Sequence, residues 1–255
     1  SRPAPSSGLL VGTTSTKIPP LLPMSRHSPR SSRRSSRPSS PDGGSSSKSG
    51  NETRPVAPTK AETALLPAFP ELTGDKIHVP QSKADCDAAV EEIVAAGVTG
   101  FDTEAKPTFR VGEKCGGPHV VQFALTDKAF LFQLHHQDSE QACAELIASK
   151  EVLKVGFGLK NDHGQIRNRL GIQLNHVLDL DQIFRKLGYR GQIGVRAAMG
   201  VLLNLKFRKS KSITTSNWAA RELSRSQLLY AANDAYAALK ILEALERIHP
   251  QLLTD

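Results

Sequence analysis

The sequence lacks the long apolar runs that membrane-spanning helices need. No uncharged apolar stretch approaches the roughly 18 residues that such a helix requires. Hydrophobic residues make up 38% of the 255 positions, which is modest for a chain expected to fold throughout. The sequence therefore predicts neither an integral membrane protein nor a membrane partner.

Cysteine is also scarce, and the three cysteines do not form a pattern. Cys86, Cys115 and Cys143 are odd in number and include no CxxC pair, so they provide neither a disulfide framework nor a zinc cage. We expect an intracellular, reducing compartment, either the cytoplasm or the nucleus, with an organelle left open.

Acidic residues are nearly missing from the first 60 positions. Ten basic side chains face two acidic ones there, and ten of the 16 prolines share the segment, which leaves 23 basic and 23 acidic residues elsewhere. This split predicts a disordered Ser/Arg/Pro-rich basic tail over 1–60, a linker over 61–74, one near-neutral domain over 75–248 and a short end over 249–255.

The role of the tail is open between two alternatives. A run of arginines and serines is typical of a solvated linker, and it also suits a weak, salt-sensitive contact with nucleic acid. Position 1 is Ser, and Met24 directly precedes the Arg/Ser run, so residues 1–23 carry no weight in the interpretation.

Apolar periodicity predicts an α/β domain with a mixed sheet flanked by helices. Two β-rich runs joined by three polar residues indicate an antiparallel hairpin. The expected strands lie at 76–79, 98–102, 119–125, 129–134, 152–157 and 176–178. The expected helices lie at 82–97, 139–149, 161–170, 181–187, 193–203 and 224–247.

Two carboxylates stand where the second of these strands ends. Asp102 and Glu104 are two residues apart, so they point to the same face of the sheet and can share a cation. Turn-forming or solvated acids are the alternative for an Asp-x-Glu taken alone. A second candidate, Asp162, lies at the margin of the buried stripe of its helix, where an acid that complements the helix dipole is equally plausible.

The last helix places an acid away from solvent. A buried stripe repeats at helical spacing after a Ser224-x-x-Gln227 capping box. Asp234 lies on a strip of small and apolar residues, whereas its neighbour Asn233 is expected on the solvated arc. A carboxylate in such surroundings needs a partner, for which a metal is the natural choice. Tyr230 lies one turn earlier on the same face, with a core tyrosine as the alternative.

These residues also carry a family resemblance. Phe101-Asp-Thr-Glu104, Gly156-Phe-Gly-Leu-Lys-Asn-Asp162 and Tyr230-Ala-Ala-Asn-Asp234 resemble, in order, the three motifs of the DEDD-type 3′–5′ exonucleases, in the DEDDy variant. Lys211-Ser-Ile-Thr-Thr-Ser-Asn-Trp218 is similar to the run before the third motif in Werner-type and related small exonucleases. The resemblance covers about 75–248 and is closer to these than to ribonuclease D.

The resemblance implies a ribonuclease H-like fold and a two-cation site of Mg²⁺ or Mn²⁺. Asp102, Glu104 and Asp234 would then hold one cation, while Asp102 and Asp162 help to place the second, and Tyr230 would orient the attacking water. The implied activity is hydrolysis of phosphodiester bonds from a free 3′ end of DNA or RNA, releasing 5′-mononucleotides.

Basic residues near the motifs are candidate contacts for phosphate. A solvated loop is the alternative for each of them. The candidates are Lys106, Lys206, Arg208, Lys209 and Lys211.

An active nuclease is the leading hypothesis for this sequence. The alternatives are a catalytically silent, exonuclease-like module that binds nucleic acid and a processing subunit that acts only with a protein partner. The presence of all four acids and the tyrosine favours activity.

Overall fold

The structure is a computed structural model that describes residues 54–109, 112–113 and 116–253. Most of the predicted basic tail lies outside these residues, so its disorder stays a prediction. Within the described part of the chain, no helix combines the length and the apolar character needed to span a bilayer.

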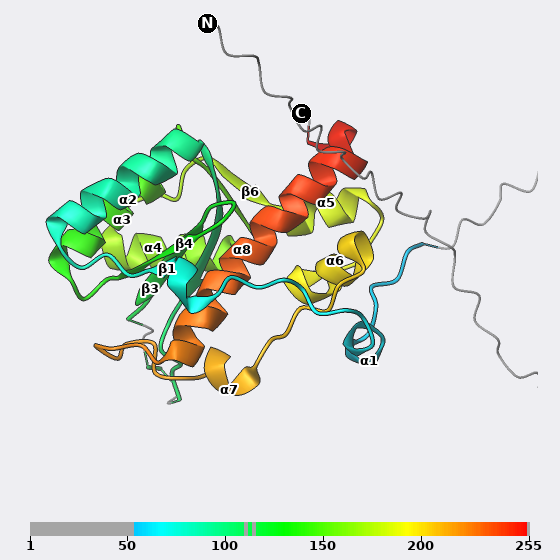
Figure 1. Cartoon of the computed structure of the whole chain (residues 1–255), viewed down its shortest axis with the longest axis horizontal. Coiled ribbons are helices and arrows are strands. Elements are labelled where there is room, and N and C mark those ends of the chain that lie inside the picture. The colour runs from blue at the N-terminus through cyan, green and yellow to red at the C-terminus, as the bar shows by residue number, and fades with distance from the viewer. Residues whose placement is uncertain (1–53, 110–111, 114–115, 254–255) are drawn as a thin grey trace, which may run out of the picture. The chain divides into compact units, whose positions relative to one another are not determined.

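A six-stranded mixed sheet forms the centre of the fold (Figure 1). Its order is β1-β4-β3-β2-β5-β6, in which β3 runs antiparallel to both β2 and β4 and the remaining pairs are parallel. The strands are β1 (Ile77–His78), β2 (Val98–Glu104), β3 (Val120–Ala124), β4 (Ala129–Gln133), β5 (Leu153–Gly156) and β6 (Val177–Asp179). The predicted mixed sheet and its hairpin are therefore confirmed.

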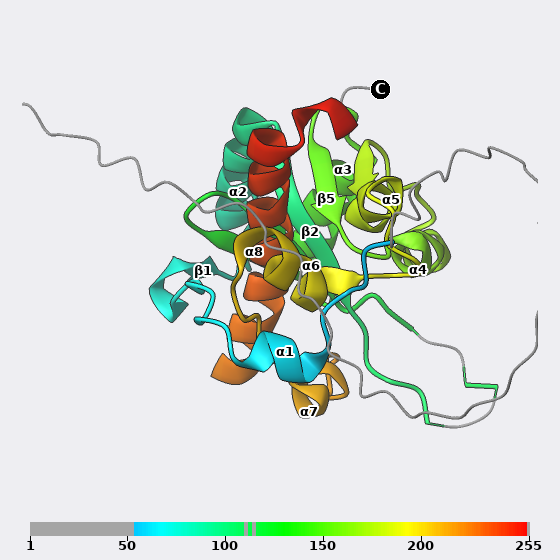
Figure 2. The same cartoon turned by 90° about the vertical axis from the view of Figure 1, so that its right-hand side faces the viewer.

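Helices cover both faces of the sheet (Figures 1 and 2). On one face α2 and α3 pack on a core that includes Phe101 and Phe123, and on the other α8 crosses the strands. The helices are α1 (Lys60–Ala64), α2 (Lys83–Ala96), α3 (Gln137–Ala148), α4 (Lys160–Leu170), α5 (Leu180–Lys186), α6 (Gly194–Leu203), α7 (Lys211–Thr214) and α8 (Arg225–Ile248). Two short 3₁₀ turns lie at Gly74–Lys76 and Pro250–Leu252.

The capping residues explain where the main helices begin and end. Ser82 caps α2 through a capping box with Asp85, and Gly97 ends that helix with a φ of 69°, a conformation that glycine adopts without a steric penalty. Ser224 and Gln227 form the predicted capping box at the start of α8. The sequence did not predict α1 and α7, because neither is long enough to show a periodic pattern.

The segment 54–73, which we call the strap, packs against the rest of the domain although much of it was predicted as a linker. Its residue Phe69 is 6% exposed and its backbone N–H donates to the carbonyl of Lys206 at 3.0 Å. The Lys206 N–H donates in turn to the carbonyl of Pro67 at 2.7 Å. The strap is thus paired with the segment that leads into α7.

The strap also corrects the predicted position of Asn233. We expected this residue on the solvated arc of α8, but it is 3% exposed. Its side-chain oxygen accepts from the Leu72 N–H at 2.7 Å, and its amide donates to the Leu72 carbonyl at 3.3 Å. The prediction was wrong because the strap covers this side of the helix and satisfies the amide.

Candidate active site

A glycine in β2 brings the last helix onto the sheet. A Cβ at Gly100 would lie 1.9 Å from the backbone oxygen of Ala235 in α8, which is closer than any real contact. Fully buried alanines, Ala231 and Ala232, continue the small surface of α8. Because no large side chain separates the two elements, α8 carries Asp234 directly to the end of β2.

Three carboxylates converge at this point. Asp102 and Glu104 lie on the same face of β2, and one oxygen from each lies within 4.8 Å of an oxygen of Asp234 and of the other. Glu104 is 8% exposed and Asp234 is 4% exposed, while Asp102 is partly exposed. The convergence that was expected for these three acids is therefore present.

Burial and neighbouring acids destabilise the charged forms of these carboxylates. Loss of hydration, followed by repulsion from Asp234, raises the pKa of Asp102 to about 8. Loss of hydration and repulsion from Asp102 raise the pKa of Glu104 to about 9, and burial also raises the pKa of Asp234. Such a cluster gains stability when a cation neutralises it.

Lys209 is the positive charge closest to this cluster in the described structure. Its Nζ lies 2.9 Å from Oδ2 of Asp234 and 5.8 Å from the centre of the Tyr230 ring. Burial lowers the pKa of Lys209, but the attraction of Asp234 and Asp102 outweighs it and raises the pKa overall, so the ammonium stays charged. Oδ2 of Asp234 is paired with this ammonium, and the described residues give Asp234 no further hydrogen bond of normal geometry.

The donor set fits hard divalent cations. Carboxylate oxygens are the ligands that Mg²⁺ prefers in proteins, and Asp234 offers two buried oxygens, of which Oδ2 faces the Lys209 ammonium. Lys209 supplies one charge to three acids that all have raised pKa values. Asp102, Glu104 and Asp234 together can therefore hold a cation.

Asp162 reaches the same strand end from α4. Its Oδ1 accepts a hydrogen bond from the Thr103 hydroxyl at 2.5 Å. Because Thr103 alternates with Asp102 and Glu104 along β2, Asp162 approaches from the opposite side of the strand. Burial raises the pKa of Asp162, and the bond from Thr103 opposes that rise. Asp162 is not part of the close group of three, so its role as a ligand stays a prediction.

Tyr230 is fixed by the segment that precedes α8. Its hydroxyl lies 2.7 Å from the Thr214 hydroxyl at the end of α7. Trp218, 1% exposed, donates from its indole nitrogen to the Thr214 carbonyl at 3.1 Å. Gln227 donates to the Ser216 hydroxyl at 2.9 Å, which ties the same loop to the first turn of α8. Trp218 is thus the packing anchor of this loop.

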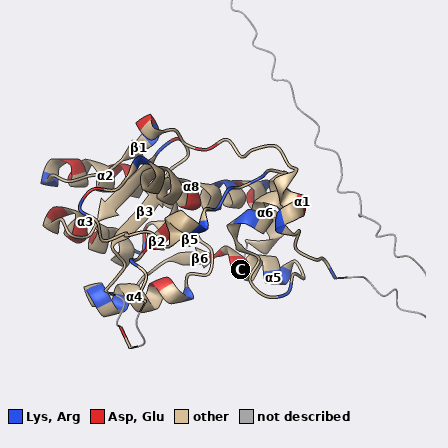
Figure 3. Ribbon diagram, turned by 90° about the horizontal axis from the view of Figure 1, so that it is seen from below, with Lys and Arg blue, Asp and Glu red and all other residues tan. Residues whose placement is uncertain are grey.

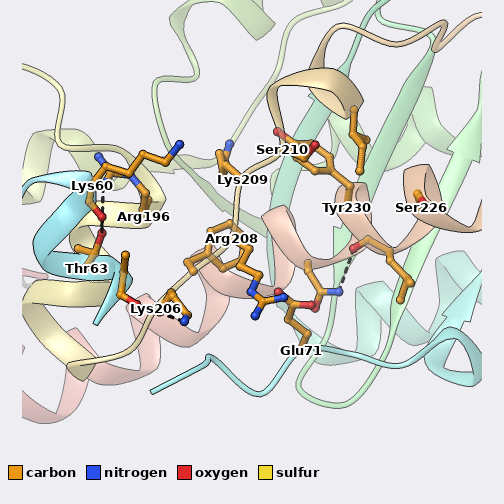
Figure 4. A pocket seen from close by; sticks show the side chains of 15 residues that line it. Lys60, Thr63, Glu71, Arg196, Lys206, Arg208, Lys209, Ser210, Ser226 and Tyr230 are labelled. Carbon is orange, nitrogen blue, oxygen red and sulfur yellow. Dashed lines mark hydrogen bonds between the residues drawn. The ribbon is translucent and has the colours of Figure 1, made fainter. Parts of the chain in front are cut away.

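Two cavities flank the acids. The smaller one, about 410 Å³, is lined by Asp102 and Asp234. The larger one, about 580 Å³, lies beside Tyr230, and we call it the α1 pocket (Figure 4). Arg196 and Lys209 line both. The α1 pocket is lined by Lys60, Thr63, Ala64, Glu71, Arg196, Lys206, Phe207, Arg208, Lys209, Ser210, Ile213, Ser226, Leu229, Tyr230 and Asn233.

The predicted basic residues separate into two groups. Lys206, Arg208 and Lys209 line the α1 pocket, whereas Lys106 and Lys211 are exposed and are not among the residues that line either cavity. Their contact with nucleic acid stays a prediction. Sequence reasoning missed Lys60, Glu71 and Arg196, because no local pattern connects them with the three motifs.

Comparison with known proteins identifies the family. The family model described as 3′-5′ exonuclease matches residues 77–249. The chain belongs to the 3′–5′ exonuclease family. A 3′-5′ exonuclease of Arabidopsis thaliana is 29% identical over 149 residues, which are 58% of this chain and 52% of that protein. The mouse bifunctional 3′-5′ exonuclease/ATP-dependent helicase WRN is 28% identical over 184 residues, 69% of this chain and 13% of the relative. The chain thus spans about half or less of these exonucleases.

Solved structures of exonucleases share the fold. The Nibbler EXO domain of Aedes aegypti superposes with a TM-score of 0.61 at 24% identity, over 72% of this chain and 93% of that one. RNase D of Trypanosoma brucei in complex with RNA U12 gives a TM-score of 0.57 at 21% identity, over 69% of each chain. The predicted ribonuclease H-like architecture is therefore confirmed.

Proposed function

We propose that the protein is a metal-dependent 3′–5′ exonuclease that hydrolyses phosphodiester bonds from the 3′ end of DNA or RNA and releases 5′-mononucleotides. The observation that carries this proposal is the convergence of Asp102, Glu104 and Asp234, with one oxygen of each within 4.8 Å of the others. Membership of the 3′–5′ exonuclease family supports the direction of digestion.

The acids have distinct proposed roles. Asp102, Glu104 and Asp234 would hold one Mg²⁺ or Mn²⁺, and Asp102 with Asp162 would help to hold a second. When bound, the two cations supply Lewis-acid activation of a water and charge stabilisation at the departing 3′ oxygen. Burial and the mutual repulsion of the carboxylates, which together raise the pKa values of Asp102 and Glu104, favour cation binding over an unliganded site.

Tyr230 would orient the attacking water rather than take its proton. Burial and the charge of Asp234 raise the pKa of the Tyr230 hydroxyl above its ordinary value, so it stays protonated at neutral pH. Its contact with the Thr214 hydroxyl fixes the direction of the phenol. A protonated and oriented hydroxyl contributes positioning, which is the part of catalysis that a fixed hydrogen bond supplies.

Lys209 would bind the substrate backbone. Its ammonium lies beside Asp234 and lines both cavities, where it can neutralise a phosphate once a cation takes over the charge of the acids. Phosphate contacts position a strand without reading its sequence, so we expect no base specificity. We also propose a reducing compartment inside the cell, from the scarcity and spacing of the cysteines.

Digestion of labelled strands tests the proposal. Single-stranded DNA, duplex DNA with recessed or overhanging 3′ ends, and RNA are each labelled at the 5′ end and incubated with Mg²⁺, Mn²⁺ or EDTA. We expect a ladder that shortens from the 3′ end only with the metals, and its loss in Asp102→Asn and Asp234→Asn. Asp87→Asn, an exposed acid on α2, is the matched control.

The same assay decides against the competing functions. A wild-type protein that binds strands but degrades none of them would indicate a silent binding module or a subunit that needs a partner. If wild type and Asp234→Asn degrade the strands equally fast, Asp234 does not belong to the catalytic site and the proposed site is wrong.

A further inference from the structure

The α1 pocket adjoins the acids but is built partly from outside the family region. The matched region begins at residue 77, whereas Lys60, Thr63 and Glu71 belong to the strap. Arg196 and Lys209 line both the α1 pocket and the cavity that contains Asp102 and Asp234. The pocket is thus the direct continuation of the site toward the N-terminal strap.

The side chains that line the pocket carry an excess of positive charge (Figure 4). Figure 3 colours the Lys and Arg positions of the ribbon blue. Its single acid, Glu71, sits close enough to Arg208 for that guanidinium to oppose the rise in the Glu71 pKa that burial causes. The Lys206 ammonium donates to the carbonyl of Ala64 at 3.2 Å. The cations that line the pocket are Lys60, Arg196, Lys206, Arg208 and Lys209.

Helix α1 fixes one of these cations. Nη1 of Arg196 donates to the Thr63 hydroxyl at 3.0 Å. Thr63 is itself 2% exposed, and its hydroxyl donates to the carbonyls of Thr59 and Lys60 at 3.1 and 3.2 Å. An arginine held by a buried hydroxyl presents its remaining donors in a set direction, which suits the bidentate binding of phosphate.

The remaining walls suit the sugar and base of a nucleotide. Phe207 is 3% exposed, and Ile213 and Leu229 are half-buried. A cavity of about 580 Å³ with apolar walls and a few convergent charged groups is the usual form of a small-molecule site.

We propose that the α1 pocket is a phosphate-binding subsite for the substrate strand, which takes the nucleotide on the 5′ side of the scissile bond. This inference rests on the proposed exonuclease activity. Lys60 and Arg196 bind the backbone phosphate there, and Thr63 is a positioning residue that acts through Arg196. The strap is therefore part of the substrate-binding surface, although it precedes the family's matched region.

Two substrates of different length distinguish a defect in this subsite from a defect in the catalytic centre. Thymidine 5′-p-nitrophenyl phosphate has a scissile bond but no nucleotide on its 5′ side. A single-stranded oligonucleotide has both the scissile bond and that upstream nucleotide. In Lys60→Ala and Thr63→Val we expect kcat/KM for the oligonucleotide to fall about fivefold to tenfold relative to the chromogenic ester. The loss should appear mainly in KM. Thr63→Ser retains the hydroxyl and should restore the ratio.

Lys150→Ala provides the matched control, because Lys150 is exposed and precedes β5, at the end of the sheet away from the acids. Equal losses on both substrates would show a structural role for α1 and overturn the subsite. Lys60 is exposed, so its variant is expected to fold even if Thr63→Val does not.

Measurements of oligonucleotide binding test the subsite independently of catalytic activity. If wild type hydrolyses neither substrate, the proposed function fails, and fluorescence anisotropy of a 3′-ended oligonucleotide then decides the subsite. Removing one phosphate contact should lower the slope of log Kd against log salt by about 0.7 for a single strand. An unchanged slope and Kd in Lys60→Ala would overturn the subsite as well.

Discussion

The ammonium of Lys209 and the carboxylate of Asp234 lie 2.9 Å apart, with Nζ facing Oδ2. The lysine comes from the segment before α7 and the acid from the middle of α8. This pair therefore connects the most buried acid of the cluster to the segment that lines the α1 pocket. It also places a permanent positive charge where both a cation and a phosphate are proposed to bind.

Lys209→Met should therefore lower the stability of the metal-free protein and increase the stabilisation that Mg²⁺ provides. In EDTA we expect a loss of about 1–3 kcal/mol in the free energy of unfolding, because Asp234 loses its partner while still buried. Mg²⁺ should restore more stability to this variant than to wild type, since the site no longer holds an internal cation. Urea denaturation with and without Mg²⁺ measures both, and equal Mg²⁺ effects in the two proteins would contradict the idea.

Asp102→Asn should make the metal-free protein less sensitive to pH. The folded state raises the pKa of Asp102 from 3.8 to about 8, so it binds the proton more tightly than the unfolded state does. This contribution is complete below pH 3.8 and is lost as the pH rises toward about 8. In EDTA, the variant should gain about 1–2 kcal/mol over wild type between pH 5 and pH 8. Parallel stability curves would refute the raised pKa of Asp102.

Tyr230→Phe should reduce kcat by about 10- to 100-fold with little change in KM, because the phenol orients a water and does not bind the strand. Thr214→Val should give a smaller loss, since it removes only the group that directs the hydroxyl. Single-turnover digestion of a 3′-ended strand measures both effects. A loss in Thr214→Val that exceeds the loss in Tyr230→Phe would point to a different role for α7.

Gly100→Ala should be severely destabilising. The added methyl group would lie 1.9 Å from the Ala235 oxygen, so α8 must move away from β2, at a cost of about 3 kcal/mol or more. Activity should be lost at the same time, because the movement separates Asp234 from Asp102. Gly74→Ala is the control, as a Cβ there meets nothing within 4 Å. Thermal denaturation of both variants gives the comparison.

Lys154 should give the protein an alkaline gain in stability. This fully buried lysine donates to the carbonyls of Leu146 and Ser149 at 3.0 and 2.8 Å, and loss of hydration lowers its pKa from 10.5 to about 8. Its neutral form is therefore favoured in the folded state. Stability should rise by about 1–3 kcal/mol, relative to Lys154→Met, between pH 8 and 10.5.

Paired urea titrations at pH 7, 9 and 10 measure this difference, with the exposed Lys150→Met as the control for general alkaline effects. A constant difference between wild type and Lys154→Met across this range would refute the lowered pKa.

The parts of the site that obey local periodicity were predictable from the sequence. The two-residue spacing of Asp102 and Glu104 fixes their common face on any strand. Helical spacing similarly placed Asp234 away from solvent, and it is 4% exposed. These rules depend on neighbouring residues alone, so they hold before the tertiary structure is known.

The parts of the site that depend on tertiary contacts between distant segments were not predictable from the sequence. Periodicity gives the angle of Asn233 around α8 but does not say that the strap lies against that angle. In the same way, Arg196 and Thr63 meet only because α1 packs on α6. Contacts of this kind join residues that no short pattern relates, which is why the α1 pocket was missed.

The pairing of Asn233 with Leu72 bears on how this domain can be transferred between proteins. One side chain of α8 binds both backbone groups of a strap residue, immediately next to Asp234 in the sequence. A gene fusion that joined the domain at residue 77 would therefore expose a buried amide beside that acid. The portable unit therefore includes Leu72, and a recombination event has to carry this part of the strap with the three motifs to transmit an intact site.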